Sequence, residues 1–179
     1  IGVPLGILAA RSNVADLVMR PALDGMQTMP AFVYLVPAIM FFSLGNVPAV
    51  MATIIYAVPP AIRFTNLGIR QVSPETLEAA RSFGTTPMQL LIKVQFPMAL
   101  PTIMAGINQT TMLALAMVVV AALVGAGGLG EDVWRALGRQ EAGNAVLGGL
   151  GIVFMAIIIY RVTQALAKGQ QDALAGNNG

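Results

Sequence analysis

The residue types that usually carry catalysis or bind metals are scarce in this chain of 179 residues. It contains no His and no Cys, which excludes histidine acid–base chemistry, thiol nucleophiles and the usual zinc ligands. No acidic residue lies in the middle of a long apolar segment, so the usual catalytic sets are absent. We therefore expect no catalytic residue, no metal site and no enzymatic activity in this chain.

One glycine-rich stretch, Gly125 to Gly130, fits the G-x-G-x-x-G pattern of dinucleotide-binding folds. That pattern requires a preceding strand, whereas a helix-length apolar segment precedes it here. A turn at the outer end of a helix is therefore the favoured interpretation. The sequence has no G-x-x-x-x-G-K-[ST] stretch, and its only lysines are Lys93 and Lys168. We expect this chain to bind no cofactor, and any ATP to be bound by a partner subunit.

Four consecutive polar residues interrupt a long apolar segment. They are Asn108, Gln109, Thr110 and Thr111. Polar side chains inside a span can line a path for a polar solute, or they can form hydrogen bonds between helices. Both interpretations remain open, and helix–helix contacts are favoured because polarity alone does not define a site.

The composition is that of a membrane protein. Apolar residues make up 56% of the chain and charged residues 10%, whereas soluble domains have about 25% charged residues. A spanning helix needs roughly 20 apolar residues, and Ile1–Ala10, too short to span, is interpreted as the end of a helix whose beginning is missing. Further spans are predicted at Gly25–Gly45, Val47–Ile62 (with its end bent by Pro59 and Pro60), Pro101–Val124 and Ala145–Tyr160. The predicted fold is all-α and polytopic, with about five transmembrane helices.

The distribution of Lys and Arg predicts the orientation. Cytoplasmic loops of membrane proteins carry an excess of these residues. Eight of the ten cations fall on one side, in the loops 11–28 and 63–100 and after Tyr160, and two fall in Gly125–Asn144. We therefore expect residues 63–100 and the C-terminal tail, 165–179, to be cytoplasmic and Gly125–Asn144 to be external.

The polar segment Arg63–Pro101 is predicted to hold two short helices. Ser73, followed by Pro74 and Glu75, is typical of a helix start, and Gly84 is a typical helix stop. Thr86-Pro87-Met88-Gln89 has the capping-box pattern of a second start, and Pro97 is expected to end that helix. Two helices of about three turns are too short to cross a bilayer, so we expect a compact cytoplasmic knob.

The residues of this knob resemble a motif of ABC-importer permeases. Its members here are Glu78, Ala79, Ala80, Gly84, Val94, Phe96 and Pro97. Val94 and Phe96 stand where that family has Ile and Leu. The stretches Leu23–Pro37 and Pro101–Thr110 further resemble permeases of glycine betaine and proline betaine importers, which take up osmoprotectants.

The resemblance implies the fold and the partners. It implies a permease domain over residues 1–164, with a coupling loop at residues 63–101 that inserts into a groove of a cytoplasmic ATPase. It also implies a second permease copy and an external substrate-binding protein. A quaternary ammonium group is held by aromatic rings, and the sequence shows no aromatic cluster around Trp134 or the three Tyr. Tight selection of a betaine is therefore expected on the separate binding protein.

Two alternatives differ from an ABC permease. A channel or secondary transporter for small solutes would explain the spans, although it leaves the two-helix knob without a purpose. An intramembrane enzyme would need residues that the chain lacks. Dependence of uptake on an ATPase subunit would discriminate between the first alternative and a permease.

Overall fold

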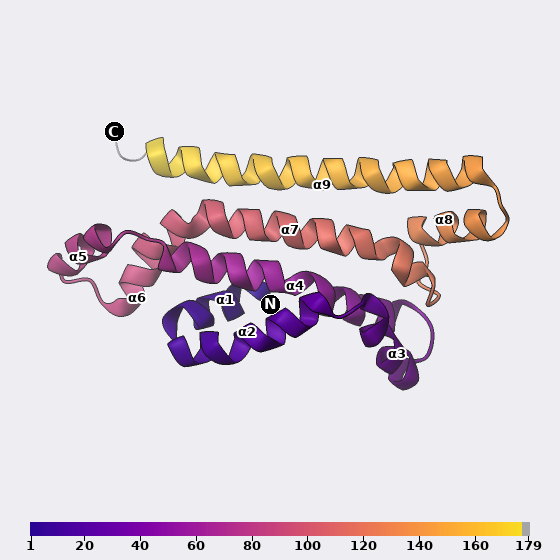
Figure 1. The fold of residues 1–179 in the computed structure, drawn as a ribbon. Coiled ribbons are helices and arrows are strands. Elements are labelled where there is room, and N and C mark those ends of the chain that lie inside the picture. Colours follow the sequence, from indigo (N-terminus) through magenta and orange to yellow (C-terminus); the bar gives the residue numbers. More distant parts are fainter. Residues whose placement is uncertain (177–179) are drawn as a thin grey trace. The chain divides into compact units, whose positions relative to one another are not determined.

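The computed structural model describes the backbone of residues 1–176 and the side chains of residues 1–165. Within these residues the chain is helical and contains no strand, as the sequence predicts. Contacts divide it into two compact units. The first comprises Ile1–Pro21, Pro60–Asn108 and the chain from Val162 onward, and the second comprises Ala22–Pro59 and Gln109–Arg161. Figure 1 shows the helices in chain order.

Three helices are long and apolar enough to cross a membrane. They are α4 (Asn46–Arg70), the continuous helix Pro87–Ala122, which includes α7 (Phe96–Ala122), and the first 24 residues of α9 (Ala142–Gly176). The helix α9 extends through most of the tail predicted at 165–179, and residues 177–179 lie outside the described part. The prolines Pro59 and Pro60 do not end α4, contrary to the expected end near Ile62. Neighbouring groups can compensate for the missing N–H groups inside a membrane helix.

The predicted span Gly25–Gly45 is divided between two helices. These are α2 (Asn13–Thr28) and α3 (Ala31–Phe42), and they meet at 93°. The bend falls at Pro30, which disfavours a helical backbone at the residue before it. Together the two helices are apolar enough for one broken span, and α1 (Gly2–Arg11) is short. The described residues therefore contain three spanning helices, or four with the bent pair, and the total of five stays a prediction.

The second unit has an apolar core formed by α3, α4, α7 and the turn after α7. Its buried members are Leu35, Ala49, Ala52, Met117, Val124 and Ala126. At its edge, the N–H of Gly45 donates to the carbonyl oxygen of Val124 at 2.8 Å, and the N–H of Gly127 donates to Oδ1 of Asn46 at 3.2 Å. These two bonds attach the glycine-rich turn after α7 to the turn before α4.

The glycine-rich stretch is a connection between helices, as its context predicts. Gly125 and Gly128 have φ values of 81° and 104°, which glycine adopts without steric cost. The stretch leads from α7 into a further helix, α8 (Leu129–Gly138), which the sequence analysis assigned to a loop. Gly130 lets α8 approach the carbonyl oxygen of Val118 on α7. Close packing of α8 against α7, which leaves no room for a Cβ atom, thus explains the glycine at position 130.

Candidate functional site

The first part of the polar segment is the helix α5 (Pro74–Ser82), which lies on the surface of the first unit. The Ser73 hydroxyl accepts a hydrogen bond from the N–H of Thr76 at 3.4 Å, and Pro74 occupies the first turn. The predicted helix start is therefore confirmed. None of the residues of α5 is buried, so the helix presents most of its surface for contact with another molecule. Figure 1 shows α5 and α6 beyond the end of α4.

The turn after α5 also forms as predicted. Gly84 has a φ of 76°, a conformation that is costly for residues with a Cβ. The Thr85 hydroxyl donates to the carbonyl oxygen of Ala80 at 2.9 Å, which satisfies one of the last carbonyls of α5. In the capping box, the N–H of Gln89 donates to Oγ1 of Thr86 at 3.3 Å, and the N–H of Thr86 donates to Oε1 of Gln89 at 2.9 Å. The next helix, α6 (Pro87–Leu90), thus has a fixed start.

Pro97 does not end the second helix, and that expectation is wrong. After α6 the chain widens into the π-helical segment η1 (Leu91–Gln95), and α7 follows without a break. The N–H of Phe96 bonds the carbonyl oxygen of Leu91, five residues earlier. Since proline lacks an N–H and its ring clashes with the carbonyl four residues before it, a wider turn lets the helix continue. The second short helix is therefore the start of a long one.

The motif residues fall into an exposed group and a packed group. Glu78, Ala79 and Gly84 are exposed and Ala80 is half-buried. By contrast, Val94, Phe96 and Pro97 are half-buried at the base of the segment. Phe96 packs against a buried cluster formed by Ile69, Leu91, Ala99 and Ile103. The structure thus assigns the first group to the surface and the second group to the junction with α7.

An exposed apolar side chain that the sequence analysis did not single out accompanies the motif. Phe83 is 88% exposed, directly before Gly84. Met88 and Ile92 are also more than half exposed on α6 and η1. Contiguous exposed apolar patches are typical of interaction surfaces, so we take these three side chains as candidates for one. The sequence feature that could have indicated this surface is a Phe directly before a helix-ending glycine, in a segment too polar to span a membrane. We call residues 71–92 the docking segment.

A buried carboxylate near the docking segment was also missed. Asp16 on α2 is 7% exposed. Its Oδ1 accepts from Nδ2 of Asn66 at 2.7 Å, and its Oδ2 lies 2.6 Å from Arg20 and 3.8 Å from Arg70. Arg70 also donates to Oδ1 of Asn66 at 2.8 Å. We call Asp16, Asn66 and Arg70, with Asn13 beside them, the Asp16 cluster. The pair on α2 and the pair on α4 are about 50 residues apart in sequence, so no local pattern revealed the cluster.

The four candidate path residues have different environments. Oδ1 of Asn108 is buried and has no hydrogen-bond partner among the described residues. Gln109 is exposed, whereas Thr110 and Thr111 are half-buried and both have partners. Successive residues on a helix point about 100° apart, so the four cannot line one face. Neither the path nor the helix-contact interpretation is decided by this arrangement.

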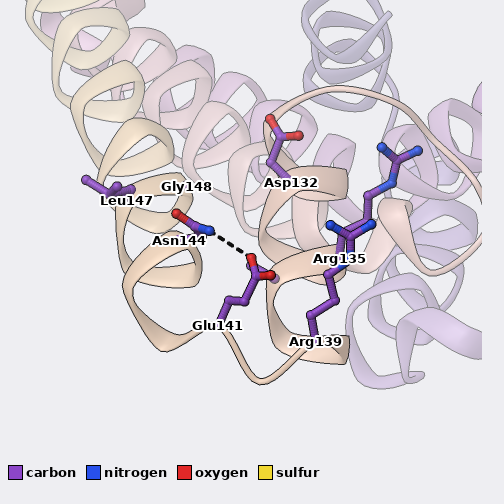
Figure 2. Close-up of a pocket in the computed structure, with 8 residues that line it drawn as sticks. Asp132, Arg135, Arg139, Glu141, Asn144, Leu147 and Gly148 are labelled. Atoms are coloured by element: carbon purple, nitrogen blue, oxygen red, sulfur yellow. Dashed lines mark hydrogen bonds between the residues drawn. The ribbon is translucent and has the colours of Figure 1, made fainter.

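A charged pocket lies between α8 and the start of α9 in the second unit (Figure 2). It has a volume of about 400 Å³. Asn144 donates from Nδ2 to Oε2 of Glu141 at 2.7 Å, and Arg135 forms an ion pair with Glu131. The lining residues include Asp132, Arg135, Arg139, Glu141, Asn144 and Gly148. Opposite charges are thus interspersed on the hairpin predicted to be external. No cluster of acidic residues in the described part could hold a metal ion.

The helical fold and the motif on its surface define a class of membrane transport subunit. The chain belongs to the family described as the binding-protein-dependent transport system inner membrane component, whose profile matches residues 2–176. Two relatives are particularly similar. The glycine betaine/proline betaine transport system permease protein ProW of Escherichia coli is 59% identical over 172 residues, which cover 96% of this chain and 49% of ProW. The glycine betaine/carnitine transport permease protein GbuB of Listeria monocytogenes is 60% identical over 168 residues, covering 94% and 60%.

The chain therefore spans about half the length of the relatives that it matches. A solved structure agrees with the fold. A chain of the MetNI methionine ABC transporter in an inward-facing conformation superimposes with a TM-score of 0.78. The superposition covers 95% of this chain and 86% of that chain, at 22% sequence identity. This likeness concerns the fold alone.

Proposed function

We propose that this chain is the membrane-spanning permease of an ATP-driven importer for glycine betaine or a related quaternary-ammonium osmoprotectant. The observation that carries the proposal is the 59% identity to a glycine betaine/proline betaine permease over 96% of the chain. The second relative is named for glycine betaine and carnitine, so both names include a quaternary ammonium with a carboxylate. The docking segment, with Phe83 exposed directly before Gly84 of the motif, supports coupling to a separate ATPase.

In this proposal, ATP is hydrolysed by the cytoplasmic partner and the permease converts that partner's closure into movement of its helices. Two copies of the permease form the translocation path between them. The mixed charges of Asp132, Arg135 and Arg139 on the external hairpin support contact with a substrate-binding protein there. Charged side chains at the rim of such a contact favour the correct partner and speed association.

The test is uptake by the reconstituted complex. Permease, ATPase and binding protein are placed in proteoliposomes, with radiolabelled glycine betaine on the side of the binding protein. We expect uptake that requires ATP on the side of the ATPase and that stops when the ATPase is omitted. Uptake that persists without the ATPase and follows an ion gradient would instead identify a secondary transporter.

The permease alone is proposed to hydrolyse no ATP and to bind betaine weakly. Isothermal titration of the purified chain with glycine betaine is expected to give no micromolar affinity, because the sequence shows no cluster of aromatic residues of the kind that holds an ammonium group. The complete complex, titrated in the same detergent with the binding protein present, is the control. Micromolar binding by the chain alone would mean that selection does not depend on the binding protein.

The exposed Phe83 is proposed to contact the ATPase directly. Aromatic side chains are enriched among the residues that carry most of the binding energy of protein interfaces. Phe83→Ser should therefore reduce the amount of ATPase that co-purifies with the permease. Val14→Ser is a matched control, since Val14 is 72% exposed but lies on α2, outside the docking segment. Equal retention of the ATPase by both variants would contradict a contact at Phe83.

A further inference from the structure

The side chain of Arg70 joins three helix ends within the first unit. Arg70 is the last residue of α4, and the chain enters the docking segment directly after it. Its Nη1 donates to Oδ1 of Asn13 at 2.8 Å, where α2 begins. Its Nη2 donates to the carbonyl oxygen of Ala9 at 2.8 Å, near the end of α1. The third donor, Nε, bonds Asn66 on α4 itself.

The C-terminal end of α1 and the carboxylate of Asp16 favour a cation at this position. The carbonyl of Ala9 belongs to the last turn of α1, where carbonyls lack helical partners and the helix dipole is negative. Asp16 lies in the first turn of α2 and supplies a buried negative charge, which needs a partner. Since the Arg70 guanidinium offers several fixed donors at once, it donates to acceptors at both helix ends.

A second contact links the same corner to the docking segment. Ser12 separates α1 from α2 in an extended conformation, and its hydroxyl accepts from the N–H of Ala15 at 3.2 Å. Next to it, Nη1 of Arg11 lies 3.8 Å from Sδ of Met88 at the start of α6. The corner between α1 and α2 is thus tied to both sides of the docking segment, through Arg70 before α5 and through Arg11 after it.

We propose that Arg70 is a positioning residue that carries displacement of the docking segment to the corner between α1 and α2, with Asp16 as its buried counter-charge. This inference rests on the proposed function, in which the ATPase moves the docking segment. The hydrogen bonds from the Arg70 guanidinium to Ala9 and Asn13 connect the end of α4 to the corner. A shift of the end of α4 therefore either moves the corner with it or breaks these hydrogen bonds. The cluster therefore makes the corner follow the segment.

The first test replaces Arg70 by Lys in the complete importer. Lysine keeps the positive charge but loses the planar arrangement of donors. The variant can therefore still neutralise Asp16, but it cannot hydrogen-bond all the helix ends at once. We expect the Arg70→Lys importer to retain its ATPase subunit and to hydrolyse ATP at a rate within about twofold of wild type. Uptake per ATP hydrolysed should fall about tenfold, equivalent to the loss of roughly one strong hydrogen bond.

Arg20→Lys is the matched control. Arg20 approaches the same carboxylate more closely, at 2.6 Å, but its side chain is 68% exposed and lies on the same helix as Asp16. Its ion pair with Asp16 lies within α2 and does not connect α4 to the corner, so its variant should couple normally. If both variants lost coupling equally, charge neutralisation alone would explain the effect and the positioning role of Arg70 would be wrong.

A distance measurement tests the connection independently of transport. Spin labels at Val14 on α2 and Ser82 on α5, both exposed, report whether the corner follows the docking segment. The wild-type distance should stay the same with and without ATP, whereas the Arg70→Lys distance should broaden or shift when ATP binds. An unchanged, sharp distance in this variant would overturn the inference.

The outcomes separate the inference from the function on which it rests. Normal coupling by Arg70→Lys in an importer whose wild type shows ATP-dependent uptake would reject the positioning role and leave the function intact. Absence of ATP-dependent uptake by the wild type would reject both. If Arg70→Lys does not fold, Asn13→Ala removes one acceptor of the same side chain, and it should give a partial loss of coupling. Full coupling in Asn13→Ala would then count against the proposal.

Discussion

Gly106 of α7 lies directly against Phe64 of α4 within the first unit. A Cβ atom at position 106 would lie 2.6 Å from Cβ of Phe64 and 3.1 Å from the carbonyl oxygen of Pro60. Small residues at helix crossings allow this close approach in membrane proteins. We predict that Gly106→Ala separates the two helices and lowers stability by about 1–3 kcal/mol, the usual range for overpacking.

Thermal unfolding of the purified protein in detergent measures this effect. Gly25→Ala is the control, because Gly25 lies within α2 and a Cβ atom there would meet no other atom within 4 Å. That variant should be neutral or slightly stabilising, since Ala is a better helix former than Gly. Equal midpoints for both variants would show that the crossing at Gly106 is looser than the structure indicates.

At Gly84 the constraint is the backbone conformation, because no atom lies within 4 Å of a Cβ there while φ is 76°. Gly84→Val should cost on the order of 1 kcal/mol or more from the left-handed conformation and misdirect α6. Gly84→Asn should be tolerated better, since Asn adopts this conformation more readily. We expect normal membrane insertion of both, with ATP-driven uptake lost for Val and largely kept for Asn. Equal uptake by the two would remove the conformational argument.

Glu78 tests the contact surface of α5. Its carboxylate is exposed and has no ion-pair partner among the described residues, although Arg81 lies one turn away. We predict that Glu78→Gln leaves expression and insertion normal yet weakens ATPase co-purification or abolishes uptake. Support of its own helix would be worth only a few tenths of a kcal/mol. Glu75→Gln, on the same exposed helix but outside the motif, is the control, and normal transport by Glu78→Gln would refute a docking role.

The Tyr34 hydroxyl holds the bend between α2 and α3. It donates to the carbonyl oxygen of Met26 at 2.6 Å and lies 3.2 Å from that of Gly25, both in the last turn of α2. The carbonyl of Gly25 also accepts from the N–H of Met29 at 3.1 Å, and carbonyls in the last turn of a helix generally lack helical partners. We predict that Tyr34→Phe lowers stability by about 1 kcal/mol, the usual net value of a hydrogen bond. Thermal unfolding of Tyr34→Phe beside the wild type measures it, and equal midpoints would mean that water replaces the hydroxyl.

Local sequence patterns predicted the parts of the fold that depend on local chemistry. The caps at Ser73 and Thr86 and the turn at Gly84 formed as expected because each is decided within about four residues. Prolines were less informative, since Pro59 and Pro97 lie within continuous helices whereas Pro30 breaks one. Whether a proline bends or ends a helix depends on what surrounds it. The Asp16 cluster could not be predicted because Asp16 and Arg70 meet only through tertiary packing.

The predicted orientation can be measured with single cysteines, because these 179 residues contain no Cys. Gln71 lies at the start of the docking segment and Gly138 lies at the end of α8, and both are exposed. Eight of the ten cations lie in the segments predicted to share the side of Gln71, and such an excess is typical of the cytoplasmic side. We predict that, in intact cells, a membrane-impermeant maleimide labels Gly138→Cys but not Gln71→Cys. Permeabilised cells, in which both variants should react, control for the reactivity of the two cysteines. External labelling of Gln71→Cys would show that the topology is the reverse of the predicted one. The docking segment would then be out of reach of a cytoplasmic ATPase.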